Sequence, residues 1–224
     1  MLRPKKKITR KEIQRDPFLE TVDQAQAHLE ENRSKYLQLG IVLLILLLGY
    51  NITTNRKSQR DIDASASLGD ALLTLDNDDL TTAQFQFETV LNEFDNTPSA
   101  SVAGYYLGKI NYNAGNMEEA GRYLNSYIKV SPKGFLAPSA TIMLADISAN
   151  DDQLKEAIQI LNKGIRNVNS KKDLRLLRLR KAELELRQGN KDIAKSIVEE
   201  LLLEDGITNW NKQRAQEIVG RIVS

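Results

Sequence analysis

The stretch Ala114–Gly134, AGNMEEAGRYLNSYIKVSPKG, decides the fold because its pattern returns along the chain. It begins with a Gly-Asn turn, continues as an amphipathic segment with helical spacing, and ends near Pro132. A small residue, Ala120, is followed one helical turn later by a large apolar one, Leu124. The same pattern recurs 37 residues before and after it, which is the spacing of the residues Ala83, Ala120, Ala157 and Ala194.

Small residues recur in this one register on both helices of each unit. The second helix carries Ala83, Ala120, Ala157 and Ala194, and the first helix carries Ala71, Gly108, Ala145 and Ala182. Antiparallel helices approach closely only at small residues, so we predict that these positions are the packing points of helical hairpins. The turn between the two helices of each unit contains, in order along the chain, Asp78-Asp79, Gly115-Asn116, Asp152-Gln153 and Gly189-Asn190. A fixed period of this length predicts an α-solenoid.

The second unit is similar to the tetratricopeptide repeat family. The residues that carry this resemblance are Leu107-Gly108, Tyr112, Gly115-Asn116, Ala120, Leu124 and Pro132. The chain departs from the family in its period, which is 37 rather than about 34 residues, and in Gly104, which stands at the family's tryptophan position. We expect an all-α fold with about four tetratricopeptide-like hairpins. A C-terminal capping helix from Trp210 to Ile222 would close the end of the core with the side chains of Trp210, Ile218, Val219 and Ile222.

The resemblance implies that the first helix of each hairpin lines a concave groove that binds peptides. Carried over by position, the candidate protein-binding residues are Val102, Tyr105, Lys109, Tyr112, Asn113, Ile142, Asp146, Asn150, Leu176, Leu179, Glu183 and Leu186. This face is largely apolar, which suits hydrophobic or partly unfolded segments. The lysine–asparagine clamp that some relatives use for C-terminal carboxylates is not evident. The alternative is a shallow groove that the C-terminal helix partly fills.

A second feature is the uncharged stretch from Tyr36 to Asn55, YLQLGIVLLILLLGYNITTN, between Lys35 and Arg56. As a helix, it would span about 30 Å, the thickness of a bilayer's hydrocarbon core. We therefore predict a single transmembrane helix over 35–55, and the alternative is a buried core helix. The stretch starts behind a long charged tail and no small-residue cleavage site follows it, so it should remain as an anchor.

Residues 1–34 are expected to form a basic tail containing a short amphipathic helix. Asp16-Pro17 is a helix-start signal, and an apolar stripe follows it at Phe18, Val22, Ala25 and Leu29. This helix either leads into the span or lies on the membrane surface or a partner. The basicity of the tail favours a cytoplasmic N-terminus, which would place the repeat domain, residues 56–224, outside the cytoplasm.

Nothing in the sequence predicts catalysis, a cofactor or a metal site. The chain has 224 residues, a net charge of +1, one histidine and no cysteine, which excludes thiolate chemistry and gives no reason to expect nucleic-acid binding. Asp76–Leu80, DNDDL, resembles the start of a calcium loop but lacks its glycine and distal glutamate, so we read it as a hairpin turn. The basic segment Lys171–Arg187 is either a solvated helix with pairs such as Lys181–Glu185 or a site for an acidic partner or lipid.

The order of these parts resembles the ancillary subunits of the bacterial Sec translocon. That resemblance implies a single-pass protein of the bacterial inner membrane, with its repeats in the periplasm. Its partners would be translocon subunits, periplasmic chaperones and exported chains, besides the lipid bilayer. We therefore expect a non-catalytic, membrane-anchored scaffold with chaperone-like character. The alternative is a structural adaptor of another envelope complex, in cell division or outer-membrane assembly.

Overall fold

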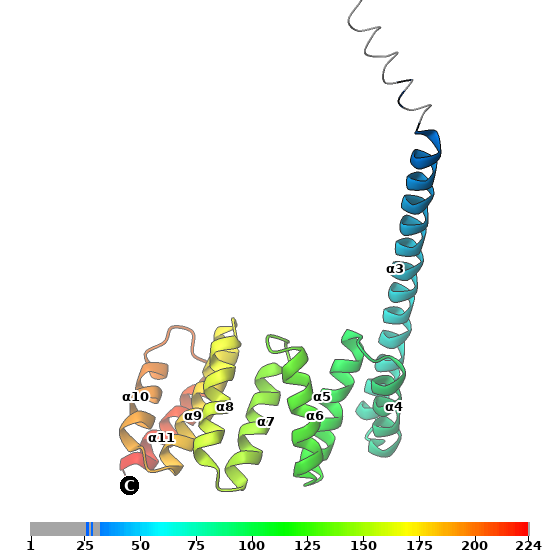
Figure 1. The fold of residues 1–224 in the computed structure, drawn as a ribbon. Coiled ribbons are helices and arrows are strands. Elements are labelled where there is room, and N and C mark those ends of the chain that lie inside the picture. Colours follow the sequence, from blue (N-terminus) through cyan, green and yellow to red (C-terminus); the bar gives the residue numbers. More distant parts are fainter. Residues whose placement is uncertain (1–25, 27, 29–31, 224) are drawn as a thin grey trace, which may run out of the picture. The chain divides into compact units, whose positions relative to one another are not determined.

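The computed structural model describes residues 26, 28 and 32–223, except for the side chains at 33, 36, 40 and 48–55. The chain divides into two compact units, residues 1–58 and 59–224. Throughout the described residues the regular structure is helical, which confirms the prediction of an all-α solenoid (Figure 1). The helices are α3 (Arg33–Asp76), α4 (Leu80–Glu93), α5 (Pro98–Asn113), α6 (Met117–Val130), α7 (Ala137–Asn150), α8 (Leu154–Asn167), α9 (Lys171–Arg187), α10 (Lys191–Leu202) and α11 (Asn209–Val223).

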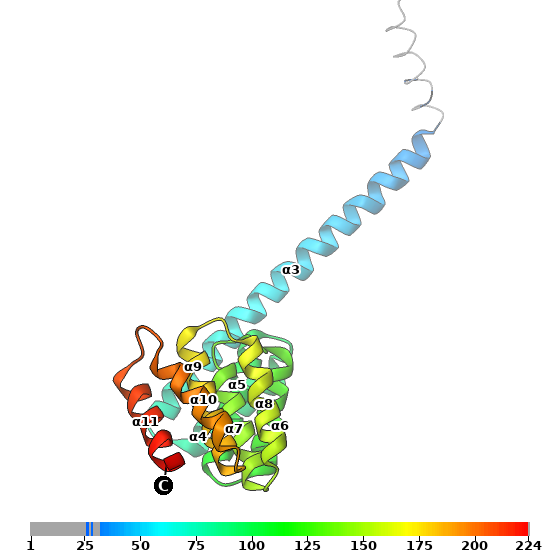
Figure 2. The same cartoon turned by 90° about the vertical axis from the view of Figure 1, so that its left-hand side faces the viewer.

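Residues 59–224 form a row of helical hairpins. The end of α3 packs with α4, and the pairs α5–α6, α7–α8 and α9–α10 follow, each pair in contact with the next (Figures 1 and 2). The last helix, α11, packs against α9 and α10. The core is correspondingly a series of clusters between neighbouring helices, as expected for a solenoid.

The hairpin turns repeat the same backbone geometry at the predicted register. One residue in each turn has a positive φ: Asp78 (60°), Gly115 (83°), Asp152 (60°) and Gly189 (91°). The next residue donates its backbone N–H to the carbonyl of the residue five positions earlier, as in Asn116 to Asn111 and Asn190 to Glu185, both at 2.9 Å. Glycine adopts a positive φ freely and aspartate tolerates it better than most residues, which explains why these two types occupy the position.

The small-residue positions lie in the core. Ala71, Ala83, Ala120, Ala145, Ala157, Ala182 and Ala194 are fully buried. A Cβ atom on Gly108 would lie only 2.7 Å from Cγ of Leu124, on the other helix of the same hairpin. A side chain at this position would therefore push α5 and α6 apart.

The C-terminal helix differs from the prediction at one residue. Ala215 and Ile218 are buried and Ile222 packs beside them, so α11 covers the end of the core. Trp210, in contrast, is 56% exposed, so its predicted role in the core is wrong. The buried stripe follows helical spacing back from Ile218 to Asn211, and Trp210 is one residue off that stripe.

Much of the predicted N-terminal organisation falls outside the described residues. This applies to most of the basic tail with its amphipathic helix, and to the side chains at 36, 40 and 48–55 of the predicted span. Among the residues that the structure does describe, no helix is both long enough and apolar enough to cross a membrane. Within α3, the described large apolar side chains from Leu37 to Leu47 are all exposed by 54% or more.

Candidate protein-binding surfaces

The first helices of the second, third and fourth hairpins place three charged residues at one register position. These are Lys109 on α5, Asp146 on α7 and Glu183 on α9, each 37 residues from the next. All three belong to the predicted groove. The structure brings the two carboxylates into one polar network and leaves the lysine in a different environment.

We call that network the ionic chain. It crosses four helices and consists of Tyr112, Asp146, Arg180, Glu183, Arg214 and Glu217. Arg180 donates to Asp146 Oδ1 and to Glu183 Oε2, both at 2.6 Å. Arg214 of α11 donates to the other oxygen of Glu183 at 2.7 Å. The carboxylates of Asp146 and Glu183 are therefore satisfied within the chain.

Burial shapes the proton affinities in the ionic chain. It raises the pKa of Asp146 above its ordinary value, and the neighbouring Arg180 limits that rise. Burial, together with the Asp146 carboxylate, also raises the pKa of Tyr112. The phenol therefore stays protonated and donates to Asp146 Oδ2 at 3.3 Å.

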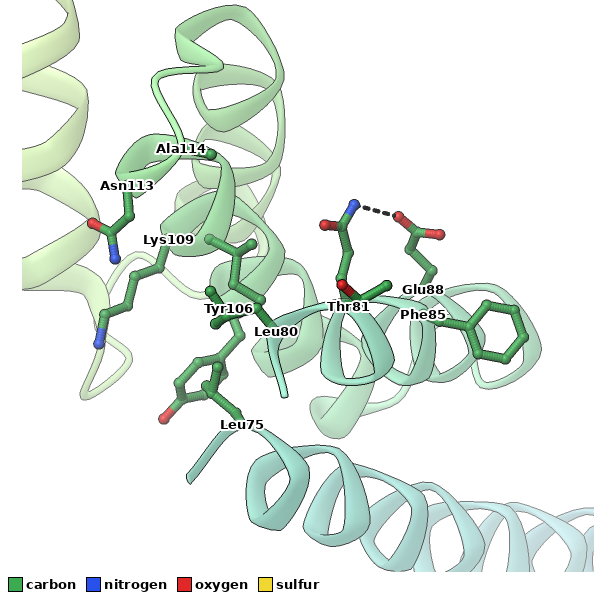
Figure 3. Close-up of a pocket in the computed structure, with 11 residues that line it drawn as sticks. Leu75, Leu80, Thr81, Phe85, Glu88, Tyr106, Lys109, Asn113 and Ala114 are labelled. Atoms are coloured by element: carbon green, nitrogen blue, oxygen red, sulfur yellow. Dashed lines mark hydrogen bonds between the residues drawn. The ribbon is translucent and has the colours of Figure 1, made fainter. Parts of the chain in front are cut away.

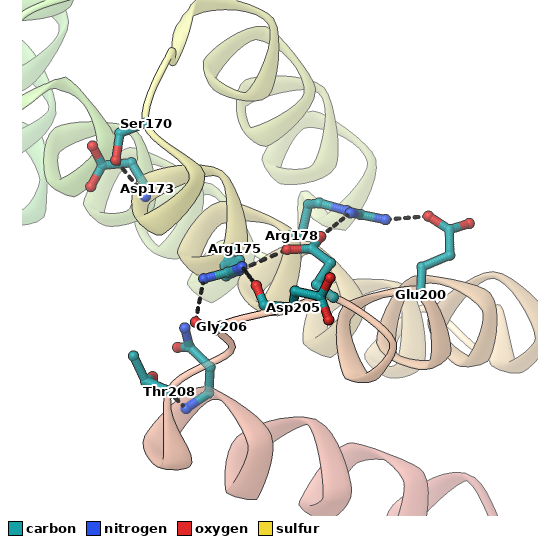
Figure 4. Close-up of polar contacts among 10 residues, drawn as sticks. Ser170, Asp173, Arg175, Arg178, Glu200, Asp205, Gly206 and Thr208 are labelled. Carbon is teal, nitrogen blue, oxygen red and sulfur yellow. Dashed lines mark hydrogen bonds and ion pairs between the residues drawn. The ribbon is translucent and has the colours of Figure 1, made fainter.

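The basic segment of α9 is also used internally (Figure 4). Arg175 is 7% exposed and donates to Glu204 Oε2 at 2.7 Å and to the carbonyls of Asp205 and Gly206 at 2.8 and 2.9 Å. Arg178 pairs with Glu200 and with Glu204. These arginines hold the link between α10 and α11, so they are not a free surface for an acidic partner or a lipid.

The predicted pair between Lys181 and Glu185 does not form among the described residues. Glu185 is buried and accepts a hydrogen bond from Asn190 Nδ2 at 2.7 Å. Asn190 lies in the hairpin turn, so Glu185 braces that turn and does not balance a surface lysine.

The end of α3, α4 and α5 form a pocket of about 630 Å³, which we call the first-repeat pocket (Figure 3). Its apolar lining includes Leu80 and Phe85, which are 55% and 69% exposed. Tyr106 is held in place by stacking on Phe87, with ring centroids 5.2 Å apart. The lining residues are Leu75, Leu80, Thr81, Gln84, Phe85, Glu88, Tyr106, Lys109, Ile110, Asn113 and Ala114.

The polar groups of this pocket lie on opposite sides of the apolar middle. Figure 3 shows Lys109 and Asn113 of α5 on one side and Glu88 of α4 on the other. Glu88 accepts a hydrogen bond from Gln84 at 3.1 Å. The side chains of Lys109 and Asn113 have no hydrogen-bond or ion-pair partner within the described part of the chain.

The predicted groove residues are therefore divided among several environments. Lys109 and Asn113 line the first-repeat pocket, whereas Tyr112, Asp146 and Glu183 belong to the ionic chain. The remaining groove residues outside the core include one exposed side chain, Asn150, and four half-buried ones, Val102, Ile142, Leu176 and Leu186.

Two of the predicted groove residues are buried in the core. Tyr105 and Leu179 are only 3% and 4% exposed. The Tyr105 hydroxyl donates to Ser139 Oγ of the next first helix at 2.9 Å, and Leu179 packs in the cluster beneath α11. Neither side chain is available to a ligand, because neighbouring helices cover it.

The sequence reasoning missed the contribution of α4. The family resemblance points only to first helices, whereas Leu80, Phe85 and Glu88 lie on a second helix. A signal was present in the register. The positions equivalent to Phe85 in the other units are polar, Arg122, Gln159 and Ser196, so an aromatic residue there is the exception.

A comparison with protein families identifies one match. The model described as "Tetratricopeptide repeat-like domain" matches residues 26–168, which is more than half of the chain. No curated protein sequence matches the chain significantly.

Solved structures with the same arrangement of helices are distant in sequence. BtubC (BKLC) from P. vanneervenii has a TM-score of 0.53 and 13% identity, over 75% of this chain and 89% of that one. YrrB, described as a TPR protein with an unusual peptide-binding site, has a TM-score of 0.51 and 18% identity, over 70% and 83%. TTC0263, a thermophilic TPR protein in Thermus thermophilus, has a TM-score of 0.51 and 18% identity, over 70% and 84%. At these identities the likeness concerns the fold alone.

Proposed function

The chain belongs to the tetratricopeptide repeat-like family, and from this premise we propose that it is a non-catalytic, membrane-anchored scaffold that binds partner polypeptides. This fold is typical of protein–protein interaction scaffolds. The observation that carries the proposal is the first-repeat pocket, where exposed apolar side chains lie beside Lys109 and Asn113, which have no partner among the described residues. An apolar concavity with a few polar groups is the usual form of a binding site.

The anchor is the second part of the proposal. The described side chains between Leu37 and Leu47 include nine large apolar ones, all more than half exposed and spread around α3. A helix that is apolar on every side is stable only when protein or lipid surrounds it. The basic tail before it favours a cytoplasmic N-terminus, with the repeats on the other side of the bacterial inner membrane.

The partners follow from this placement. A scaffold held at the outer surface of the inner membrane meets exported polypeptides, together with translocon subunits and periplasmic chaperones. The resemblance of the layout to the ancillary subunits of the Sec translocon supports this choice. A structural adaptor in cell division or outer-membrane assembly is the alternative, and it would share the anchor but bind folded envelope proteins.

The experiment that tests this proposal is site-specific photo-crosslinking in cells. A photoreactive residue replaces Leu43 or Leu80 in the full chain, and the crosslinked proteins are identified by mass spectrometry. We expect translocon subunits from position 43 and exported chains from position 80. The matched control is Glu118, an exposed residue outside the pocket, from which we expect no enriched protein.

Each outcome of this experiment has a separate meaning. Division or outer-membrane assembly proteins at both positions, without any translocon subunit, would favour the adaptor. Recovery of the full chain in the soluble fraction after cell lysis would overturn the anchor. A reporter fused to the C-terminus that is active only in the cytoplasm would overturn the proposed orientation.

A further inference from the structure

We propose that the first-repeat pocket selects apolar polypeptide segments that carry an acidic side chain, with Lys109 and Asn113 binding the carboxylate. This inference rests on the proposed function and specifies the partner's chemistry. It concerns a pocket between α4 and α5, and therefore a surface that includes a second helix as well as a first helix.

The charge pattern along the first helices indicates that Lys109 is available to a ligand. At the position of Lys109 the next two hairpins have Asp146 and Glu183, and both carboxylates are paired with arginines of the chain. The partner of Asp146 on the next first helix is Arg180, 34 residues later. The residue 34 positions after Lys109 is Met143, which cannot pair with a lysine. The second hairpin thus has a reversed charge and no internal counter-ion among the described residues.

Binding of an apolar segment also requires an apolar surface beside Lys109, and the pocket has one. Leu80 is 55% exposed at the centre of the lining, between the two polar sides (Figure 3). A segment that places an apolar side chain on Leu80 brings its neighbouring residue to Lys109 and Asn113. A carboxylate there accepts from both an ammonium and an amide, and an ion-assisted hydrogen bond is about twice as strong as a neutral one.

The opposite side of the pocket fixes the direction of the segment. Glu88 repels a carboxylate, and among the described residues only its Oε1 is engaged, by Gln84, so that Oε2 can accept from the ligand. The acidic end of the segment therefore lies on α5, and an amide or basic group faces α4. Acidic side chains are favoured on one side of the apolar residue and disfavoured on the other.

The test begins with a random octapeptide library on phage, panned against the full chain in detergent micelles. Enriched sequences are then synthesised with acetylated N-termini and with either amidated or free C-termini, and their dissociation constants are measured by fluorescence anisotropy. We expect enriched peptides to combine apolar residues with Asp or Glu on one side. Replacing that Glu by Gln should weaken binding about tenfold, the equivalent of about 1.4 kcal/mol.

The variants assign this loss to the pocket. Lys109→Met should remove the difference between the Glu and Gln peptides, whereas Lys109→Arg should keep it. Leu80→Ser should weaken both peptides equally. Lys129→Met is the matched control, because Lys129 is an exposed lysine of α6 outside the pocket, and binding should not change. Circular dichroism of each variant shows that the fold is intact.

Several results would overturn the inference. Glu and Gln peptides that bind equally to the unaltered chain would show that no carboxylate is recognised. Binding only of peptides with a free C-terminus would assign the site to terminal carboxylates. A library without any enriched sequence would show that the pocket does not bind peptides of this length. The crosslinking result at Leu43 is independent of all three, so the proposed anchor and scaffold could stand while this inference fails.

Discussion

The ionic chain and the first-repeat pocket share the register position of Lys109, Asp146 and Glu183, and they have opposite properties there. In the third and fourth hairpins, charged residues on the first helices pair with each other across helices. In the first and second hairpins, the first-repeat pocket leaves a lysine unpaired and apolar side chains uncovered among the described residues. The difference teaches that one register position of a solenoid can hold paired carboxylates in two hairpins and, among the described residues, an unpaired lysine in another, without a change of fold. Substitutions in the two regions should therefore have different consequences.

Of the substitutions in the two regions, one in the ionic chain is expected to lower the free energy of unfolding most. Arg180→Met leaves the Asp146 and Glu183 side chains, only 17% and 14% exposed, without the cation between them. We expect a loss of about 2–3 kcal/mol in the free energy of unfolding, somewhat less than for a fully buried pair because Arg180 is itself partly exposed. Urea denaturation measures it.

The matched variant in the pocket is Lys109→Met. Lys109 is exposed and has no partner within the described residues, so the free energy of unfolding should change by less than about 0.5 kcal/mol. Equal losses in Arg180→Met and Lys109→Met would erase the contrast between the two regions.

The second prediction tests the contact of α5, the helix common to both regions, with α6. Gly108→Ala places a Cβ atom 2.7 Å from Leu124 Cγ and 3.3 Å from its backbone nitrogen. We expect a loss of about 1–3 kcal/mol in the free energy of unfolding. Gly104→Ala is the control on the same helix, where the nearest atom is 3.7 Å away, and there we expect no loss. A stable Gly108→Ala variant would show that α5 and α6 can separate at little cost.

A third prediction concerns pH. Because burial raises the folded-state pKa of Asp146, this group adds stability that is fully present below its unfolded pKa and is lost as the pH rises through its folded pKa. The free energy of unfolding of the unaltered chain, relative to Asp146→Asn, should therefore increase as the pH is lowered through the acidic range. Denaturation at a series of pH values measures it. The opposite slope would mean that Arg180 outweighs burial at this carboxylate.

The smallest effect is expected at the edge of the pocket. Phe85 is 69% exposed, so Phe85→Ser should change the free energy of unfolding by less than about 0.5 kcal/mol. Phe87, two residues later on α4, is fully buried and serves as the control, since Phe87→Ala should cost about 3–5 kcal/mol in the same urea measurement. A large loss in Phe85→Ser would indicate that the pocket lining supports the fold.

The repeat could be predicted from the sequence because its signals are local. A small residue on each helix and an Asp or Gly in each turn follow from close packing and from a positive φ, and both recur at the same spacing. The amphipathic stripe of α11 was also readable, although Trp210 showed that one residue's shift along a helix turns a side chain from the core to the solvent.

The ionic chain and the burial of Tyr105 could not be predicted in the same way, because they depend on contacts between repeats. Tyr105 with Ser139, Tyr112 with Asp146 and Arg180 with Asp146 are all separated by 34 residues, and not by the 37 of the sequence register. Neighbouring first helices are therefore offset by about one helical turn in their contacts. That offset places Tyr105 under the next helix and pairs Arg180 with an aspartate, and no pattern within a single unit reveals it.

The ionic chain has a consequence for the cooperativity of unfolding. A solenoid stabilised only by contacts between adjacent units can lose one end while the other stays folded. Tyr112 on α5 and Arg214 on α11 belong to a single series of polar bonds through Asp146, Arg180 and Glu183. We expect these bonds to make the C-terminal end of the domain unfold in concert with the hairpins before it. The helix α5, which lines the first-repeat pocket, lies at the start of this series, so fraying at the C-terminus should not reach the pocket without breaking charged contacts along the way.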